Sequence, residues 1–133
     1  MKIIIAGCRD FNNYVLLKTK LDFYFKNVEV TEIVSGAARG ADTLGELYAK
    51  ENNISVKQFP AQWDLYGRSA GFRRNEEMAK YADALVAFWD YESRGTKDMI
   101  NRAKLYGLKV RIVDIRKEVS LWNNLVFVKR YGL

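Results

Sequence analysis

The feature that most constrains the fold of this chain is a regular alternation of short runs rich in β-branched and aromatic residues with longer helical patterns. In chain order, the expected strands and helices alternate as Lys2–Ala6, Tyr14–Lys26, Glu32–Ser35, Ala41–Asn52, Ile54–Phe59, Arg68–Tyr81, Ala84–Trp89, Thr96–Tyr106 and Lys109–Ile115. Such alternation predicts a parallel sheet covered by helices on both faces. We therefore expect a single Rossmann-like α/β domain of three layers, with a mainly parallel five-stranded sheet in the order 3-2-1-4-5.

The expected domain covers residues 1–115, and residues 116–133 are expected to form a C-terminal arm or an edge strand of the same domain. Leu125–Lys129 has the β-former content of such a strand. The arm also carries apolar Trp122, Val126 and Phe127, which are expected either to pack onto their own domain or to join two copies in a homo-oligomer.

Composition excludes several kinds of chemistry. The chain has no histidine and one cysteine, Cys8. A Ser–His–Asp triad, a histidine zinc site, a histidine general base and a thiolate metal cluster are therefore unavailable within it. We expect neither a metal nor a cofactor. The formal net charge of +6 favours an anionic partner.

The sequence also indicates where the protein works. No apolar run approaches the ~20 residues that a membrane span needs, and the start of the chain meets Arg9 and Asp10 too soon to form a signal peptide. A single cysteine suits a reducing compartment. A cytoplasmic location and no membrane partner are the expectation.

The loops after the strands are the first candidates for a binding site, because doubly wound sheets bind ligands outside the carboxyl ends of their strands. After the first expected strand, Gly7 permits close backbone approach and Arg9 can pair with a phosphate. After the second, small residues open into a helix whose first N–H groups attract anions. Asp42 either caps this helix or accepts a hydrogen bond from a ribose hydroxyl. The candidates in this second loop are Ser35, Gly36, Arg39, Gly40 and Asp42.

The loop after the fourth expected strand has a similar character. It is either a second phosphate or ribose cradle or, through Ser93 or Thr96, only an N-cap. Between the third and fourth strands, Arg74 and Asn75 are candidates to hold phosphate, and Trp63 either stacks on a base or packs as a lid or core residue. In the expected strand order, the first, second and fourth loops converge on one cleft. The candidates in the fourth loop are Ser93, Arg94, Gly95 and Thr96.

Five of these segments, taken in order, resemble the YspA/YpsA-related branch of the SLOG superfamily, which also holds the DNA-processing protein A family and the Lonely Guy proteins. The resemblance implies a Rossmann-like fold and a phosphate-bearing, nucleotide-derived ligand, such as an ADP-ribose-like molecule, which the protein senses or sequesters. It implies no settled reaction. The segments are Gly7–Phe11, Ser35–Asp42, Phe59–Trp63, Ala70–Asn75 and Phe88–Thr96.

The Lonely Guy relatives supply an enzymatic alternative, because they are phosphoribohydrolases that act on nucleoside monophosphates. Arg74–Met78 is similar to their arginine-bearing helix, and Arg74 falls at its arginine. Gly95–Met99 is similar to their glutamate-bearing loop, but Met99 stands where the glutamate should be, and a thioether cannot accept a proton. The nearest carboxylate is Asp98, one residue before the position of the glutamate. Arg74 and Asp98 are therefore the catalytic candidates if the protein is an enzyme. Other carboxylates that can substitute are Glu76, Glu77 and Asp90.

The DNA-processing proteins supply a third alternative. Their Ser-Gly-x-Ala-Arg-Gly-x-Asp loop is similar to Ser35–Asp42, and they bind single-stranded DNA. The positive charge of the chain fits such a partner, but its basic residues form no dense run. A small nucleotide-derived ligand is therefore the preferred partner, and nucleic acid the weaker one.

Overall fold

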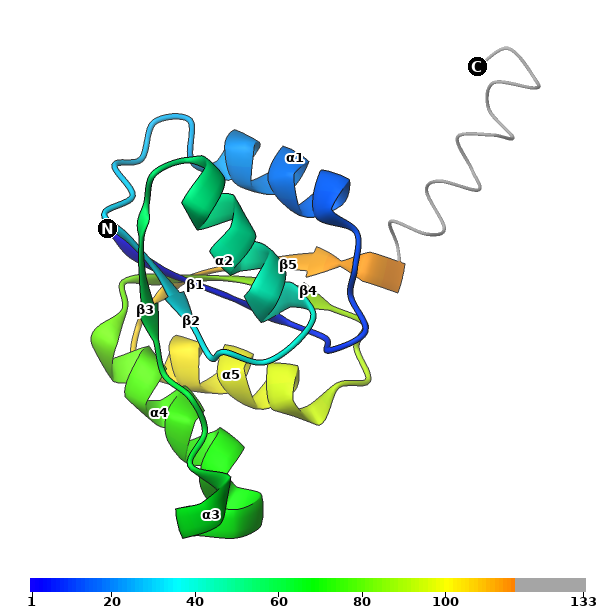
Figure 1. The fold of residues 1–133 in the computed structure, drawn as a ribbon, viewed down its shortest axis with the longest axis vertical. Helices are drawn as coiled ribbons and strands as arrows, with labels where there is room; N and C mark the ends of the chain where they lie inside the picture. Colours follow the sequence, from blue (N-terminus) through cyan, green and yellow to red (C-terminus); the bar gives the residue numbers. More distant parts are fainter. Residues whose placement is uncertain (117–133) are drawn as a thin grey trace, which may run out of the picture.

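The computed structural model describes residues 1–116 as alternating strands and helices (Figure 1). In chain order they are β1 (Lys2–Gly7), α1 (Tyr14–Tyr24), β2 (Glu32–Ser35), α2 (Ala41–Glu51), β3 (Ser55–Gln58), α3 (Trp63–Tyr66), the 3₁₀ turn η1 (Gly67–Ser69), α4 (Ala70–Tyr81), β4 (Ala84–Trp89), α5 (Arg94–Leu105) and β5 (Lys109–Asp114). The expected arm at 116–133, including Leu125–Lys129, Trp122, Val126 and Phe127, lies outside the described residues but for Arg116.

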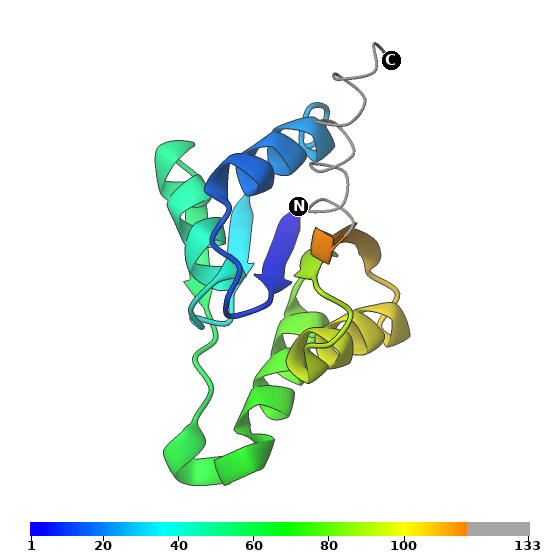
Figure 2. The same cartoon turned by 90° about the vertical axis from the view of Figure 1, so that its right-hand side faces the viewer.

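The five strands form one parallel sheet in the order β3-β2-β1-β4-β5, which confirms the predicted fold class and strand order. Central β1 has neighbours on both sides, with Ile4 opposite Val34 of β2 and Leu85 of β4. Helices α1 and α2 cover one face of the sheet, and α4 and α5 cover the other (Figures 1 and 2). The strand order reverses between β1 and β4, so the carboxyl ends of these two strands define the switch point of the sheet.

The alternation of side chains along β1 builds a core on each face. Ile3 and Ile5 point into a cluster with Leu17 of α1 and Tyr48 of α2. Ile4 and Ala6 point into a second cluster, formed with residues of α4 and α5. Because β1 is covered on both faces, its sequence is continuously apolar, as is typical of a central parallel strand.

Within residues 1–116, the sequence pattern misses α3 and the 3₁₀ turn η1 that follows it. The pattern predicts one helix over Arg68–Tyr81, whereas the chain forms α3, then η1, and begins α4 at Ala70. Gly67 ends α3 in the left-handed region, with φ of +57°. All four residues of α3 are exposed, so the segment has no apolar periodicity to mark it as a helix.

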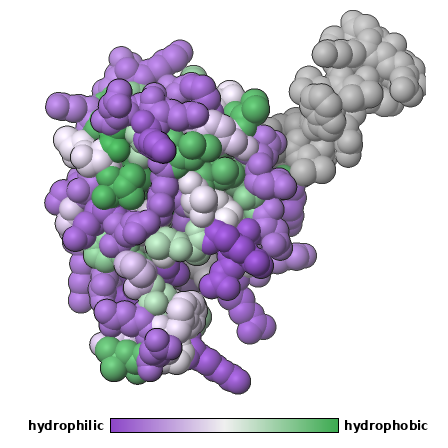
Figure 3. Space-filling model, viewed as in Figure 1, coloured by the Kyte–Doolittle hydropathy of each residue, from purple (hydrophilic) through white to green (hydrophobic). Residues whose placement is uncertain are grey.

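The other differences are shifts of one or two residues at the ends of elements. The shift that matters for the candidate site is at α5, which begins at Arg94 and not at Thr96. The Ser93 side chain accepts a hydrogen bond from the N–H of Thr96 and acts as the N-cap. Among residues 1–116, no helix combines the length and apolar content that a membrane crossing requires. On the face seen in Figure 3, hydrophilic residues dominate and apolar ones gather only in small separate groups.

Candidate functional site

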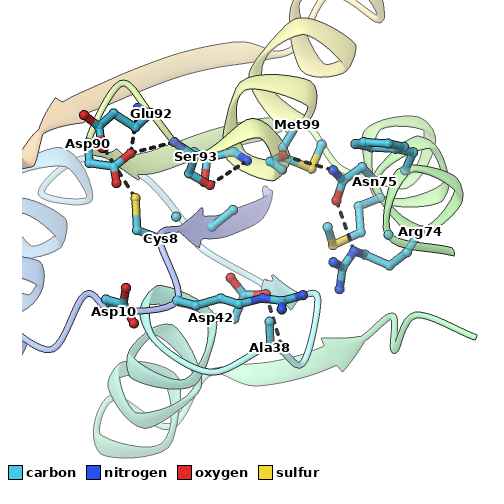
Figure 4. Close-up of a pocket in the computed structure, with 18 of the residues that line it drawn as sticks. Cys8, Asp10, Ala38, Asp42, Arg74, Asn75, Asp90, Glu92, Ser93 and Met99 are labelled. Carbon is cyan, nitrogen blue, oxygen red and sulfur yellow. Dashed lines mark hydrogen bonds between the residues drawn. The ribbon is translucent and has the colours of Figure 1, made fainter. Parts of the chain in front are cut away.

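A cleft of about 530 Å³ opens at the carboxyl ends of β1 and β4 (Figure 4). Its floor is apolar and buried, formed by Ala6 of β1, Met78 of α4 and Met99 of α5. Around this floor stand loops from four parts of the chain: after β1, before α2, around α3 and α4, and between β4 and α5. The cleft therefore lies at the switch point of the sheet, where doubly wound folds bind their ligands.

Most of the residues that the sequence singled out line this cleft. It brings together the first, second and fourth loops and the start of α4, which are far apart in sequence. The predicted site residues that line the cleft are Gly7, Arg9, Asp42, Arg74, Asn75, Ser93, Gly95 and Thr96.

A second cavity of about 450 Å³ adjoins the cleft. The two share Arg9, Ala38, Trp63 and Arg74, so the two arginines lie on the boundary between them. The second cavity is otherwise lined by the loop before α2, including predicted Gly36 and Arg39, and by Pro60 and Ala61 before α3. The arrangement is a two-chambered depression with Arg9 and Arg74 at the boundary between the chambers.

Four predicted residues line neither chamber. Ser35 is buried and donates to Glu46 at 2.5 Å. Gly40, with φ of +82°, packs against the backbone carbonyl of Cys8, where a Cβ would not fit. Arg94 is exposed at the start of α5, and Asp98 lies behind Asn75.

Arg74 is the most firmly held cation of the site. Its Nη1 donates to the carbonyl oxygen of Gly36, and its Nε donates to Oδ1 of Asn75 at 3.0 Å. A Cβ at Gly36 would overlap the Arg74 guanidinium and lie 2.8 Å from Asp42 Oδ2, so a larger residue here requires these side chains to move. Burial lowers the pKa of Arg74 from its ordinary value, while the Asp42 carboxylate opposes that shift. Arg9 stands close enough for its charge to lower the pKa of Arg74 further.

The loop before α2 is not an open anion cradle, because Asp42 fills it. Oδ2 of Asp42 accepts from the N–H of Ala38 at 3.3 Å, and the N–H of Gly36 also stabilises the carboxylate. The N-cap position belongs to Gly40, so Asp42 does not have the capping role that the sequence allows. Burial raises the pKa of Asp42 to about 6, against the opposing effects of Arg74 and these N–H groups. The protein's own carboxylate therefore takes up the N–H groups of Gly36 and Ala38, which a ligand anion would otherwise be free to use.

The loop before α5, in contrast, leads into a helix turn whose first backbone N–H donors are unengaged in the described part of the chain. Oδ1 of Asp90 accepts from the N–H groups of Glu92 and Ser93, each at 2.8 Å, and Ser93 caps the helix. The N–H groups of Arg94 and Gly95 have no hydrogen-bond partner within residues 1–116, as is usual in the first turn of a helix. A Cβ at Gly95 would meet no atom within 4 Å, so the space beside this turn is open.

The carboxylate and thiol beside this turn have opposite environments. Burial opposes ionisation of Asp90, but the N–H groups of Ser93 and Glu92 outweigh it and hold the pKa of Asp90 below its usual value. Burial raises the pKa of the Cys8 thiol to about 11, so it remains protonated near neutral pH. Cys8 is thus a small buried loop residue whose Sγ accepts from the N–H of Asp90 at 3.4 Å.

Aromatic side chains stand at the mouth of the cleft. Trp63 of α3 is 50% exposed and Phe72 of α4 is 42% exposed. The Arg9 guanidinium lies 6.0 Å from the centre of the Trp63 ring. Trp63 is therefore a rim residue and not part of the core. Arg68, Asp10 and Glu92 also line the cleft, but in the sequence nothing separates them from ordinary surface charges.

Two of the carboxylates proposed to replace the missing Lonely Guy glutamate are engaged outside the cleft, whereas a third, Asp90, lines it. Asp98 Oδ2 accepts from Arg102 Nε at 2.8 Å and from Asn75 Nδ2 at 3.0 Å. Glu76 accepts from Arg102 Nη1 and from the hydroxyl of Tyr106. The Tyr106 hydrogen bond is the main cause that lowers the pKa of Glu76, and Arg102 adds to it. Met99 itself forms part of the cleft floor.

Fold and site together define a doubly wound α/β protein with an arginine-bearing cleft at the switch point of its sheet. Residues 1–66 match the model of the YspA, cpYpsA-related SLOG family. The chain is 33% identical over 116 residues to the Gene 61 protein of Mycobacterium phage D29, an alignment that covers 82% of this chain and 93% of that protein. The chain belongs to the YspA, cpYpsA-related SLOG family, and membership indicates binding or processing of a nucleotide-related ligand.

The family match ends before α4, so it contains fewer motifs than the sequence resemblance proposes. It includes β1, α2 and the loop that Asp42 fills. Arg74, Asn75 and the open first turn of α5 lie beyond it. The roles of those later residues rest on the geometry of the cleft.

Proposed function

We propose that this protein senses or sequesters a phosphate-bearing, nucleotide-derived ligand, such as an ADP-ribose-like molecule, in the cleft. The observation that carries the proposal is that Arg9, Arg74 and the open first turn of α5 border one cleft at the switch point. Helix N–H groups and guanidinium groups are the donors that proteins commonly use for phosphate. Family membership supports the nucleotide-related part of the proposal.

Each part of the ligand has a matching part of the cleft. The phosphate would bind between the two arginines and the N–H groups of Arg94 and Gly95. A base would stack on Trp63 or Phe72, whose exposed rings stand at the mouth. Ribose hydroxyls are suitable donors for the carboxylates of Asp90 and Glu92 on the cleft wall.

The two-chambered shape favours a ligand longer than a mononucleotide. The chambers have similar volumes, about 530 and 450 Å³, and meet at Arg9 and Arg74. A pyrophosphate held at this boundary would leave one chamber for each of the two groups that it joins. ADP-ribose has this form, whereas AMP would fill one chamber.

Isothermal titration and thermal unfolding with ADP-ribose, AMP and a short single-stranded oligonucleotide test the proposal. We expect ADP-ribose to bind more tightly than AMP. At 100 times its Kd it should add about 2.7 kcal/mol to the free energy of unfolding. Binding of neither small nucleotide would contradict the proposal. Steeply salt-dependent binding of the oligonucleotide alone would favour the nucleic-acid alternative.

A second candidate function is hydrolysis of an N-glycosidic bond in a nucleotide, with Arg74 and Asp98 as the predicted pair. One observation favours it: although Asp98 itself does not line the cleft, four other carboxylates do, and these are Asp10, Asp42, Asp90 and Glu92. Chromatography of the same mixtures distinguishes the two functions. Release of free base or ribose phosphate would establish hydrolysis, and intact ligand would support binding alone.

A further inference from the structure

A chain of polar contacts runs from the cleft to the outer side of the α4–α5 pair. It begins at Arg74 on the cleft wall, passes through the side chains of Asn75 and Asp98, and ends at Arg102 and Glu76. Asn75 is 5% exposed, and Asp98 and Arg102 are partly buried. Buried polar contacts of this kind fix side-chain orientation strongly, because an unmade bond leaves a group without water to replace it.

The contacts leave only one orientation for the Asn75 amide. Its Nδ2 donates to Asp98 Oδ2 at 3.0 Å and to the carbonyl oxygen of Gly95 at 3.2 Å. These two acceptors direct the NH₂ group toward α5, and Oδ1 consequently faces Arg74 Nε (Figure 4). A flipped amide would point NH₂ at a guanidinium that only donates, and it would leave Asp98 facing a carbonyl oxygen.

The same amide also fixes the position of the Arg74 guanidinium. Asn75 Oδ1 accepts from its Nε, and the Gly36 carbonyl accepts from its Nη1. With those two donors engaged, the guanidinium lies at the boundary of the two chambers, and its Nη2 donors have no protein partner within residues 1–116. Arg74 can therefore offer them to a ligand without first reorganising.

We infer that Asp98 is a positioning residue for the anion site: it holds the Asn75 amide in the orientation that fixes Arg74. The inference rests on the proposed function for its ligand, but the orientation of Arg74 is a property of the free protein. It assigns Asp98 a role other than that of a displaced catalytic carboxylate. Asp98 does not touch the ligand, and its effect passes through Asn75.

Three variants separate positioning from the simple joining of α4 to α5. Asp98→Ala removes one of the two acceptors of the Asn75 NH₂ group and leaves only the Gly95 carbonyl to direct it toward α5, so the amide should be held less firmly. Asp98→Asn retains an oxygen that can accept from Asn75 Nδ2, so it should restore the wild-type arrangement. Arg102→Ala is the matched control, since it breaks the contacts of Arg102 with both Glu76 and Asp98 but leaves the Asp98–Asn75 bond.

The first measurement uses the ligand-free protein and follows the Arg74 Nε–H signal by ¹⁵N NMR, assigned by its absence in Arg74→Lys. We expect a slowly exchanging signal in wild type, Asp98→Asn and Arg102→Ala, and fast exchange in Asp98→Ala. Fast exchange in Arg102→Ala as well, or slow exchange in Asp98→Ala, would overturn the inference. This outcome does not depend on any ligand.

The second measurement is the affinity of the same variants for ADP-ribose and for inorganic pyrophosphate. Asp98→Ala should weaken both by about tenfold, the fold-change expected on losing one charge-assisted hydrogen bond. Asp98→Asn and Arg102→Ala should bind as wild type does. Equal weakening in Asp98→Ala and Arg102→Ala would also overturn the inference. If wild type binds neither probe, the proposed function fails and the NMR result alone decides the role of Asp98.

Discussion

At the scale of single residues, Gly36 shows how closely the parts of the site are fitted. Its carbonyl accepts from Arg74, and its Cα faces both the guanidinium and the carboxylate of Asp42. Any side chain here requires the Arg74 guanidinium to shift from its present position. The glycine is required by this close approach and not by a left-handed backbone, which the structure shows at Ala37 next to it, with φ of +58°.

Gly36→Ala should therefore lower both stability and affinity. Overpacking of a filled site costs roughly 1–3 kcal/mol of unfolding free energy, and displaced Arg74 weakens ADP-ribose binding. Gly95→Ala is the control for stability alone, because a Cβ there meets no protein atom within 4 Å but Gly95 belongs to the proposed anion site. Thermal unfolding of both variants and titration of Gly36→Ala check the prediction, and a neutral Gly36→Ala would contradict it.

Arg9 offers a direct test of which arginines reach the ligand. Arg9→Gln removes a cation from the boundary of the two chambers and should weaken ADP-ribose binding by about tenfold. Arg73→Gln makes the same charge change on exposed Arg73, which bonds to Ser69 and lines neither chamber. Equal losses in the two variants, measured by calorimetry, would mean that only overall charge matters.

The raised pKa of Asp42 predicts a pH dependence of anion binding. Above about pH 6 the carboxylate is charged and offsets Arg74; below it the carboxyl is neutral, and the field at the boundary becomes more positive. Affinity for ADP-ribose should consequently rise as pH falls from 7.5 to 5. The pyrophosphate of this ligand keeps its charge over that range, so the change in affinity reports titration of a group in the protein.

Asp42→Asn supplies the matching control. The amide keeps an oxygen for the N–H of Ala38 but carries no charge at any pH. Its affinity should vary little over the same range and lie near the low-pH value of wild type. A pH profile unchanged by this substitution would assign the titration to another group.

At the scale of elements, α3 and η1 differ from the rest of the fold. Their residues are exposed apart from half-buried Ser69, yet Trp63 and Arg68 form part of the cleft wall. Figure 2 shows this green segment projecting beyond the layer of α4 and α5. A segment with few buried contacts opens at low free-energy cost.

Hydrogen exchange followed by mass spectrometry should find residues 60–69 among the fastest-exchanging of the described chain. ADP-ribose should slow their exchange, because Trp63 and Arg68 would contact it, while the amides of β1 remain unchanged. Protection confined to the loop before α5, with none at α3, would place the ligand away from this wall.

The elements also show what can be predicted from the sequence. The strands and most helices could be predicted from local runs of residues, because burial on one face leaves a period of two or 3.6 and burial on both faces leaves a continuous apolar run. Helix α3 buries no side chain and left no such pattern. The site loops followed from their place after the strands. Two hydrogen bonds of the site could not be predicted in this way: the one from Ala38 to Asp42 and the one from Asn75 to Asp98. They depend on side-chain directions, which sequence spacing alone does not determine.

At the scale of the whole molecule, the net charge of +6 affects how fast an anionic ligand reaches the protein more than it affects the contacts in the bound complex. We expect the association rate constant for ADP-ribose to fall several-fold between ionic strengths of roughly 0.01 M and 0.15 M, over which the screening length shortens to about 8 Å. The dissociation rate constant should change less. Stopped-flow measurements of both constants test this, and a salt effect confined to dissociation would contradict it.

The carboxylate in the loop before α2 is a competitor that the protein carries with it. Because Asp42 belongs to the same chain as this loop, its effective concentration there is far above that of any dissolved ion. Chloride or free phosphate would have to displace this tethered carboxylate to bind the N–H groups of Gly36 and Ala38. The N–H groups of Arg94 and Gly95 have no such occupant within residues 1–116, so they are the donors that a dissolved anion can reach without displacing a side chain.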